Sequence, residues 1–225
     1  MQKRYIPIVT FFVVLLVVIA HLSARVTAVP AFTHAETKKV YLTFDDGPST
    51  KVTGRILDVL EQENVKATFF IVSDRVAGRE DTLKRIAEDG HTLGIHSKTH
   101  RYSEIYASDE ALIKDIRACR ERIIKVTGVT PCIYRFPGGS SLHRDKIPLV
   151  KAEGLRPIDW NAVCGDEEIP HADAETLYAQ TFKTAKGKNP VILLMHDSAP
   201  HKATAEALPR VIEEFKRQGF IFCKF

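Results

Sequence analysis

The sequence has few cysteines, and their spacing limits the kinds of site that the protein can carry. Its 225 residues include only four, Cys119, Cys132, Cys164 and Cys223, with no C-x-x-C pair among them. The usual thiolate zinc site needs closely spaced cysteines, so a site of this kind is not expected. Outside the cytoplasm the four thiols could form two disulfides, or all four could stay free.

A strong excess of basic charge is also lacking. Of the 32 basic residues, Lys3, Arg4 and Arg25 lie within residues 1–28, which contain no acidic residue. The rest of the chain therefore carries 29 basic and 28 acidic residues, a net charge of +1. Nucleic-acid-binding domains usually show a marked basic excess, so we expect no nucleic-acid partner. Repeats, low-complexity tracts and heptads are missing as well, and the length leaves no room for a second domain.

The long uncharged run of the sequence lies at the N-terminus. A basic start precedes an apolar stretch over residues 6–20, and small residues follow before position 29. This layout predicts that residues 1–28 are a signal peptide or, if uncleaved, a membrane anchor. We expect residues 29–38 to be a polar linker and residues 39–225 to be one enzymatic domain, secreted or tethered on the outer side of the membrane, in the cell envelope.

Beyond residue 38, strand-like and helix-like stretches alternate. The strand patterns are Val40–Phe44, Ala67–Val72, Thr92–Ile95, Ile133–Phe136, Leu155–Trp160, Val191–Met195 and Phe220–Phe225. The helical patterns are Val52–Gln62, Thr82–Glu88, Asp109–Val126, Arg144–Glu153, Ala174–Lys186 and Ala203–Gln218. The alternation predicts an α/β fold with a parallel sheet. We expect a distorted TIM-like (β/α) barrel of about seven parallel strands, with an open doubly wound sheet as the alternative, because polar candidates follow many strands.

Two adjacent carboxylates follow the first strand. Asp45 and Asp46 precede Gly47-Pro48, which ends the strand in a turn. Because neighbouring strand residues point to opposite faces, the two carboxylates should leave in different directions. One of them can then hold a metal while the other moves a proton. A turn with two solvated carboxylates is the alternative interpretation.

A pair of histidines follows the third strand. His96 and His100 are four residues apart, and on a helical turn this spacing places both rings on one side. With Asp46 they would form a set of two histidines and one carboxylate that leaves a position open for water, as catalytic zinc sites do. A bound divalent ion can lower the pKa of such a water to about 7. Surface or capping histidines are the alternative.

Arg135 lies near the end of the fourth strand, and Pro137 and Gly138 follow that strand. Asp45 would be the general base toward the water, and a cation such as Arg135 would keep it ionised. The planar guanidinium of Arg135 suits a carboxylate, although an ordinary surface arginine is the alternative. Glycine lets the backbone approach a ligand and offer an N–H to a developing oxyanion. We therefore expect this segment to contact the substrate.

His196 ends the sixth strand and could protonate a leaving amine. Asp166, which comes a few residues after the fifth strand, would hold this imidazole charged and oriented, or it would be an ordinary acidic loop residue. Trp160 and Leu194 would supply an apolar wall for a small acyl group. In a barrel all these strand ends meet at one face, where enzymes of this fold place their active sites.

These segments together resemble the NodB-type polysaccharide deacetylases of carbohydrate esterase family 4. The match covers about residues 38–225. Five motifs appear in the order of that family: Thr43–Pro48, His96–His100, Arg135–Gly139, Trp160–Asp166 and Leu194–His196. Each motif alone is weak, but the five together are specific.

The resemblance implies a distorted barrel and one divalent ion, zinc first and cobalt, nickel, manganese or iron as alternatives. The implied ligands are Asp46, His96 and His100. The other implied roles are Asp45 as base, His196 as acid, Arg135 as the residue that orients Asp45, and Asp166 as the residue that tunes His196.

The reaction implied by the resemblance is hydrolysis of N-acetyl groups on a cell-wall glycan, with peptidoglycan GlcNAc or MurNAc as first choice. Chitooligosaccharide deacetylation and acetylxylan ester hydrolysis are close alternatives, and an inactive glycan-binding module is a different class. Ile95, Gly138 and Glu167 depart from the family pattern, in which an asparagine, a bulky residue and a tryptophan are frequent. These departures leave the chemistry intact and the substrate open. We expect a monomer.

Overall fold

The computed structural model describes residues 36–225. The predicted signal peptide or anchor and most of the predicted linker lie outside the described residues. None of the helices within residues 36–225 combines the length and the apolar run that a membrane-spanning helix requires.

The chain alternates between strands and helices, as its pattern of apolar residues predicts. The strands are β1 (Lys39–Asp45), β2 (Thr68–Val72), β3 (Thr92–Ser97), β4 (Ile133–Tyr134), β5 (Arg156–Pro157), β6 (Ala162–Val163), β7 (Val191–His196) and β8 (Ile221–Cys223). The helices are α2 (Val52–Gln62), α3 (Glu80–Glu88), α4 (Tyr102–Ile105), α5 (Asp109–Thr127), α6 (Ile147–Ala152), α7 (Ala174–Ala185) and α8 (Lys202–Arg217). Short 3₁₀ turns cover Ser73–Arg75, Ser140–Leu142 and Arg144–Lys146.

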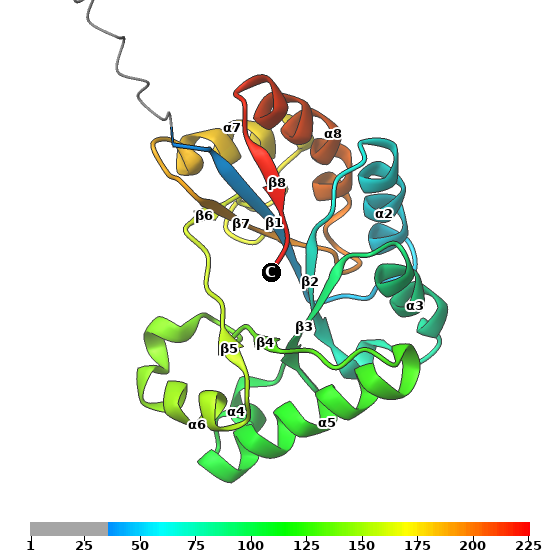
Figure 1. Ribbon diagram of the computed structural model, residues 1–225, viewed down its shortest axis with the longest axis vertical. Helices are drawn as coiled ribbons and strands as arrows, with labels where there is room; N and C mark the ends of the chain where they lie inside the picture. The colour runs from blue at the N-terminus through cyan, green and yellow to red at the C-terminus, as the bar shows by residue number, and fades with distance from the viewer. Residues whose placement is uncertain (1–35) are drawn as a thin grey trace, which may run out of the picture. The chain divides into compact units, whose positions relative to one another are not determined.

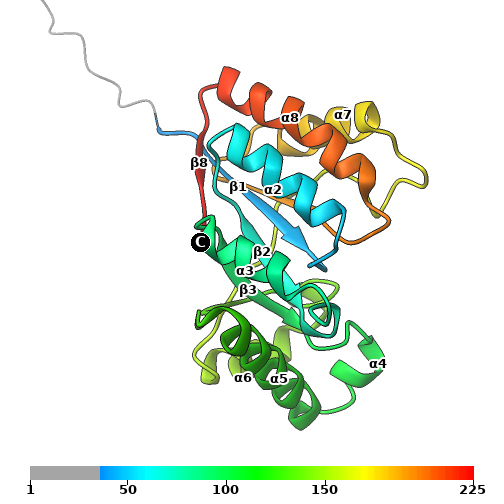
Figure 2. The ribbon, with the colours of Figure 1, turned by 90° about the vertical axis from the view of Figure 1, so that its right-hand side faces the viewer.

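All strand pairs are parallel, in the order β5-β4-β3-β2-β1-β7-β6. The sheet curls, and the helices lie around its outer side, with α2 and α3 on one flank and α7 and α8 on another (Figures 1 and 2). Within the described residues the end strands β5 and β6 are not paired with each other, so the barrel is open there. The predicted distorted barrel of about seven parallel strands is confirmed.

Two strand predictions need correction. The stretch Leu155–Trp160 contains only the two-residue strand β5, and the chain forms a further short strand, β6, just after it. The strand predicted over Phe220–Phe225 is present as β8, three residues long, but it lies outside the main strand order of the sheet. It pairs with the amino end of β1, where Lys39 lies opposite Ile221 (Figure 1).

Strand β1 is the centre of the fold because it pairs with β2, β7 and β8. Leu42, Thr43 and Phe44 point alternately to its two faces and are all fully buried, as expected of a strand covered on both faces. The β1–β7 register places Asp45 opposite His196. The carboxyl ends of these two strands therefore bring an acid and a histidine from distant parts of the sequence to one edge of the sheet.

All four cysteines are free thiols. Cys119 and Cys164 are buried, Cys223 is half-buried and Cys132 is exposed. Of the two possibilities that the sequence leaves open, the structure has the one without disulfides.

Candidate active site

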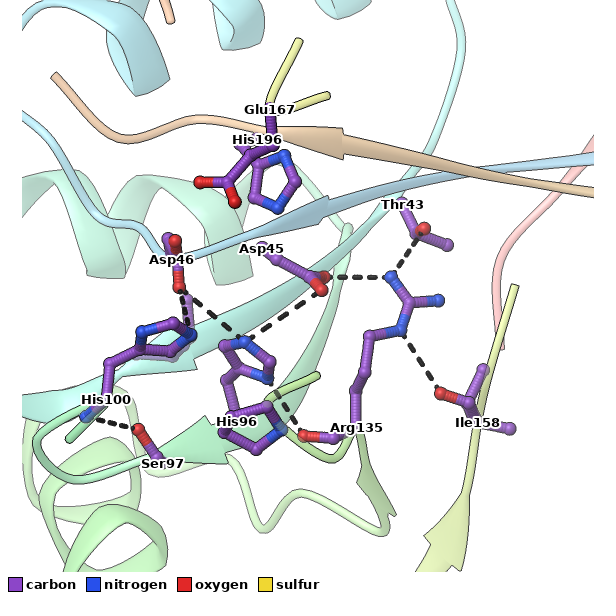
Figure 3. A network of polar contacts seen from close by, with 12 residues as sticks. Thr43, Asp45, Asp46, His96, Ser97, His100, Arg135, Ile158, Glu167 and His196 are labelled. Carbon is purple, nitrogen blue, oxygen red and sulfur yellow. Dashed lines mark hydrogen bonds and ion pairs between the residues drawn. The ribbon is translucent and has the colours of Figure 1, made fainter. Parts of the chain in front are cut away.

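The carboxyl ends of β1, β3 and β7 surround a small cavity of about 140 Å³. Asp45 and Asp46 come from the end of β1, His96 from β3, and His196 from β7 (Figure 3). These residues and His100 all line the cavity. Five chemically active side chains that the sequence predicts to be functional therefore open onto one space.

Asp45 points away from its neighbour and is held by a buried arginine. Nη1 of Arg135 donates a hydrogen bond to Oδ1 of Asp45 at 2.8 Å (Figure 3). The same Nη1 donates to Oγ1 of Thr43 at 2.8 Å, and Nε donates to the carbonyl oxygen of Ile158 at 3.1 Å. Arg135 is 0% exposed, so its interpretation as a surface residue is wrong. The carboxylate of Asp45 therefore has a fixed, buried cationic partner.

The guanidinium of Arg135 also has an apolar support. It lies over the ring of Phe70 at 4.2 Å from the ring centre, and 5.5 Å from that of Trp160. Cation–π contact of this kind is worth more when the cation is removed from water. The hydrogen bonds and the ring contacts therefore hold the guanidinium of Arg135 in one orientation. Its hydrogen bond to Asp45 in turn fixes the position of that carboxylate.

Asp46 turns the other way, toward the two histidines. Its Oδ1 is 3.2 Å from Nε2 of His100 and 3.6 Å from Nε2 of His96. One donor atom from each of the three residues lies within 4.8 Å of the others. Two imidazole nitrogens and a carboxylate oxygen are a ligand set that suits zinc and related divalent ions.

The ring of His96 is already oriented for such a role. Its Nδ1 is 2.8 Å from the carbonyl oxygen of Arg135. A carbonyl only accepts hydrogen bonds, so Nδ1 is the donor here, and the other ring nitrogen, Nε2, is directed at Asp46. A backbone partner on the second ring nitrogen is the usual way in which proteins fix a histidine ligand.

The backbone around the ligand set differs from what the sequence predicts. His96 belongs to β3, whereas His100 lies in a bend after it, with φ of 59°. The prediction that a helical turn brings the two histidines together is wrong, although the rings are only 5.0 Å apart. Asp46 also has a positive φ, 79°. Non-glycine residues in this conformation are uncommon and concentrate at functional sites.

The site fits a cation because one buried carboxylate oxygen has no hydrogen-bond partner in the described part of the chain. Oδ1 of Asp46 is buried and has no hydrogen-bond partner among residues 36–225. Burial alone would raise the pKa of Asp46, but His96, His100 and Arg75 bring it below its usual value. The carboxyl group is thus a carboxylate with a free lone pair, which is costly to bury unless a cation meets it.

His196 is coupled to a carboxylate on its far side. Its Nδ1 is 2.8 Å from Oδ1 of Asp166, and its backbone N–H donates to Oδ2 at 2.8 Å. Thr204 donates a third hydrogen bond to Asp166 at 2.7 Å. Burial lowers the pKa of His196, but the bond to Asp166 and the charges of Asp166 and Asp45 outweigh it and raise the pKa to about 9. The imidazole is therefore charged near neutral pH.

Three of the four predicted substrate-contacting residues line the cavity: Gly138, Trp160 and Leu194. Pro137 does not, and its carbonyl oxygen accepts a hydrogen bond from Tyr106 at 2.8 Å. Gly139 donates its N–H to Phe136. Gly138 is therefore the glycine of this turn whose N–H is a candidate oxyanion donor.

Several residues near the site were not assigned a role from the sequence. Asp197 is fully buried beneath the turn after β1, and burial raises its pKa to about 7. Glu167 lines the cavity, and His201 lies beside His196 with ring centres 5.1 Å apart. The only sequence signal for Asp197 was its place next to His196. His201 gave none, because its polar surroundings are typical of an exposed loop.

Comparison with known proteins connects this geometry to a family. The sequence model described as polysaccharide deacetylase matches residues 33–158. The YheN protein of Bacillus subtilis is 35% identical over 190 residues. A peptidoglycan-N-acetylglucosamine deacetylase of Bacillus cereus is 32% identical over 201 residues. Among solved structures, the catalytic domain of a peptidoglycan N-acetylglucosamine deacetylase from Eubacterium rectale has a TM-score of 0.77 and 32% identity.

Coverage differs between these relatives. The matches include 82% of this chain and 66% of YheN, and 87% of this chain and 72% of the Bacillus cereus protein. For the Eubacterium rectale domain the values are 85% and 90%. The chain thus spans about two thirds of the curated relatives and nearly all of the solved catalytic domain.

Proposed function

The chain belongs to the polysaccharide deacetylase family, and from this premise we propose that it hydrolyses N-acetyl groups of a cell-wall glycan and releases acetate. The substrate that we propose first is peptidoglycan, at its N-acetylglucosamine or N-acetylmuramic acid residues. Support comes from the substrate in the names of the Bacillus cereus and Eubacterium rectale relatives. The observation that carries the proposal is the single cavity in which Asp45, Asp46, His96, His100 and His196 meet.

We propose that Asp46, His96 and His100 hold one divalent cation, zinc first. When bound there, a cation of this class polarises a carbonyl oxygen and makes water a stronger nucleophile near neutral pH. The unpartnered Oδ1 of Asp46 and the directed Nε2 of His96 support this assignment.

Asp45 takes the proton of the attacking water in this proposal. Its Oδ1 is occupied by Arg135, which leaves Oδ2 for the water; Oδ2 already faces the ligand set, 4.0 Å from Nε2 of His96. Arg135 thus orients the base. A positioned base of this kind contributes about 10²–10⁴-fold to the rate.

His196 then gives its proton to the amine as the carbon–nitrogen bond breaks. Nδ1 is hydrogen-bonded to Asp166, so Nε2 is the atom that gives the proton to the leaving amine. Because the pKa of His196 is raised to about 9, the ring carries that proton near neutral pH. The N–H of Gly138 would meet the developing oxyanion, and one such donor is worth about 3–4 kcal/mol. Trp160 and Leu194 enclose the acetyl methyl group.

We propose that residues 1–28 direct the enzyme out of the cytoplasm, either as a cleaved signal or as an anchor, and that residues 39–225 act there as a monomer. The basic start and apolar run of the N-terminus support export. A cell-wall substrate requires the same location.

The test is acetate release by the purified full chain from GlcNAc oligomers, peptidoglycan and acetylxylan, each with chelator and after zinc is restored. We expect release from an amino-sugar polymer that chelator stops and zinc restores. Release from acetylxylan alone would change the class to an esterase. If no polymer releases acetate from folded, zinc-loaded protein, the proposal is wrong and an inactive binding module becomes the better account.

A further inference from the structure

A second cluster of potential ligands lies beside the first one and shares none of its residues. It consists of Glu167, His196 and His201, which each offer one donor atom within 4.8 Å of the others. His196 ends β7, His201 immediately precedes α8, and Glu167 lies in the loop after β6. Figure 3 shows Glu167 and His196 side by side, across the cavity from His96 and His100.

The hydrogen bonds of the two histidines leave the same ring atom free on each. Nδ1 of His196 is bonded to Asp166, so Nε2 is the atom it offers. Nδ1 of His201 is 2.9 Å from Oγ of Ser198, and its Nε2 lies 3.7 Å from Oε1 of Glu167. Each ring thus has a partner that fixes its orientation, the arrangement that is typical of metal-binding histidines.

The cluster is also accessible. Glu167 and His201 line a second cavity of about 430 Å³, which opens next to the first. The side chain of Glu167 is 54% exposed and that of His201 is 11% exposed. Glu167 and His201 can therefore be reached through the second cavity, whereas His196 lines the substrate cavity.

We propose that Glu167, His196 and His201 form a second site for a divalent cation of the zinc class, and that an ion in this site inhibits the enzyme. Two imidazoles and one carboxylate are the ligand types that zinc prefers. Inhibition follows because the ion occupies Nε2 of His196, the atom that must carry the proton for the leaving amine. The same atom cannot hold both.

This second site is weaker than the first. Asp46 and His96 are almost fully buried, whereas the side chain of Glu167 is about half exposed. Glu167 therefore loses conformational entropy when it binds an ion. Activity should therefore rise as zinc fills the first site and fall as higher zinc fills the second.

The test is zinc binding by equilibrium dialysis of the full chain, in the wild type and in His201→Gln and Glu167→Gln. We expect two equivalents in the wild type, one tight and one weaker. Each variant should keep the tight equivalent and bind the weaker one roughly tenfold less well or worse, since even the loss of an indirect partner costs about that much. The zinc concentration of half-inhibition should move by the same factor.

His171→Gln is the matched control, because His171 is an exposed histidine of the same loop as Glu167. It should bind two equivalents and be inhibited like the wild type. A wild type that binds one equivalent at inhibitory zinc would overturn the proposal. So would a second equivalent that both variants retain. Dialysis needs no substrate, so a failure here is distinct from a failure of the proposed deacetylation.

Discussion

At the scale of single residues, the buried charge of Arg135 is the feature on which the arrangement of the site most depends. Its guanidinium meets Asp45, Thr43 and the carbonyl of Ile158, without contact with water. A buried ion pair adds little net stability compared with apolar residues of similar size, but removing one partner leaves the other unpaired. The pair therefore fixes geometry more than it stabilises the fold.

Arg135→Met should lower the free energy of unfolding by about 3–5 kcal/mol, because it leaves Asp45 buried without its cation. Arg55→Met is the control, since the Arg55–Glu206 pair is more than half exposed on both sides. That change should cost no more than about 1 kcal/mol. Urea unfolding in the presence of chelator measures the free energy of unfolding of both variants. Equal losses would show that the buried Arg135–Asp45 pair is no more important for stability than an exposed pair.

The pH dependence of activity should report on His196. Its pKa is raised to about 9, so the acid is present at neutral pH and is lost as the pH rises through that value. In Asp166→Asn the charge that raises the pKa is removed while an acceptor for Nδ1 remains. The alkaline limb of kcat/KM should then move to lower pH. An alkaline limb at the same pH in both proteins would rule out Asp166 as the residue that tunes His196.

At the scale of elements, the turn after β1 is held against the end of β7. A Cβ on Gly47 would lie 2.1 Å from Oδ2 of Asp197, so only glycine fits there. Asp197 in turn accepts a hydrogen bond from Thr53 at 2.7 Å, and its backbone oxygen accepts one from Ser49 at 2.7 Å. This packing joins the start of α2 to β7 and sets the path of the chain that carries Asp45 and Asp46.

Gly47→Ala should therefore destabilise the protein by about 1–3 kcal/mol through overpacking and should also reduce activity. Gly54→Ala is the control within the next helix, α2, because a Cβ there meets nothing within 4 Å. Alanine in a helix should stabilise by as much as about 1 kcal/mol. Thermal unfolding of the two variants measures the contrast, and a neutral Gly47→Ala would contradict the account of the turn.

The sequence predicted the longer elements well because their own residues determine them. Val52–Gln62 was predicted with the bounds of α2, and Ser108 caps α5 through a hydrogen bond to the N–H of Ala111 at 3.1 Å. Short elements were predicted poorly. Helix α4 and strand β6 have four and two residues, too few for a periodic pattern, and tertiary contacts decide their form.

At the scale of the whole molecule, the convergence of the strand ends was predictable, since parallel strands bring their carboxyl ends to one face. The sequence also predicted that Arg135 and Asp166 face Asp45 and His196, although only as one of two interpretations. It located Glu167 and Asp197 only as neighbours of Asp166 and His196, and it could not predict His201 at the site. Their places depend on how the segment after β7 and the loop after β6 fold back, and no local pattern encodes that.

Zinc should stabilise the whole fold, because the first ligand set joins the ends of β1 and β3. At a free zinc concentration 100 times the dissociation constant of the first site, the gain should be about 2.7 kcal/mol. His96→Ala should lose most of this gain, whereas His171→Ala, which changes an exposed histidine, should keep it. Thermal unfolding at matched zinc shows the difference. Equal stabilisation of His96→Ala and wild type would place the tight site elsewhere.

In the proposed mechanism Asp45 is the base of a metal-dependent hydrolysis, and its replacement by asparagine is the decisive experiment. Acetate release from GlcNAc oligomers is measured for zinc-loaded wild type and Asp45→Asn, with Asp81→Asn as control because that side chain is 99% exposed. We predict that Asp45→Asn keeps its tight zinc and loses about 10²–10⁴-fold in rate, while the control is unchanged. A zinc-loaded Asp45→Asn enzyme as fast as the wild type would contradict the account.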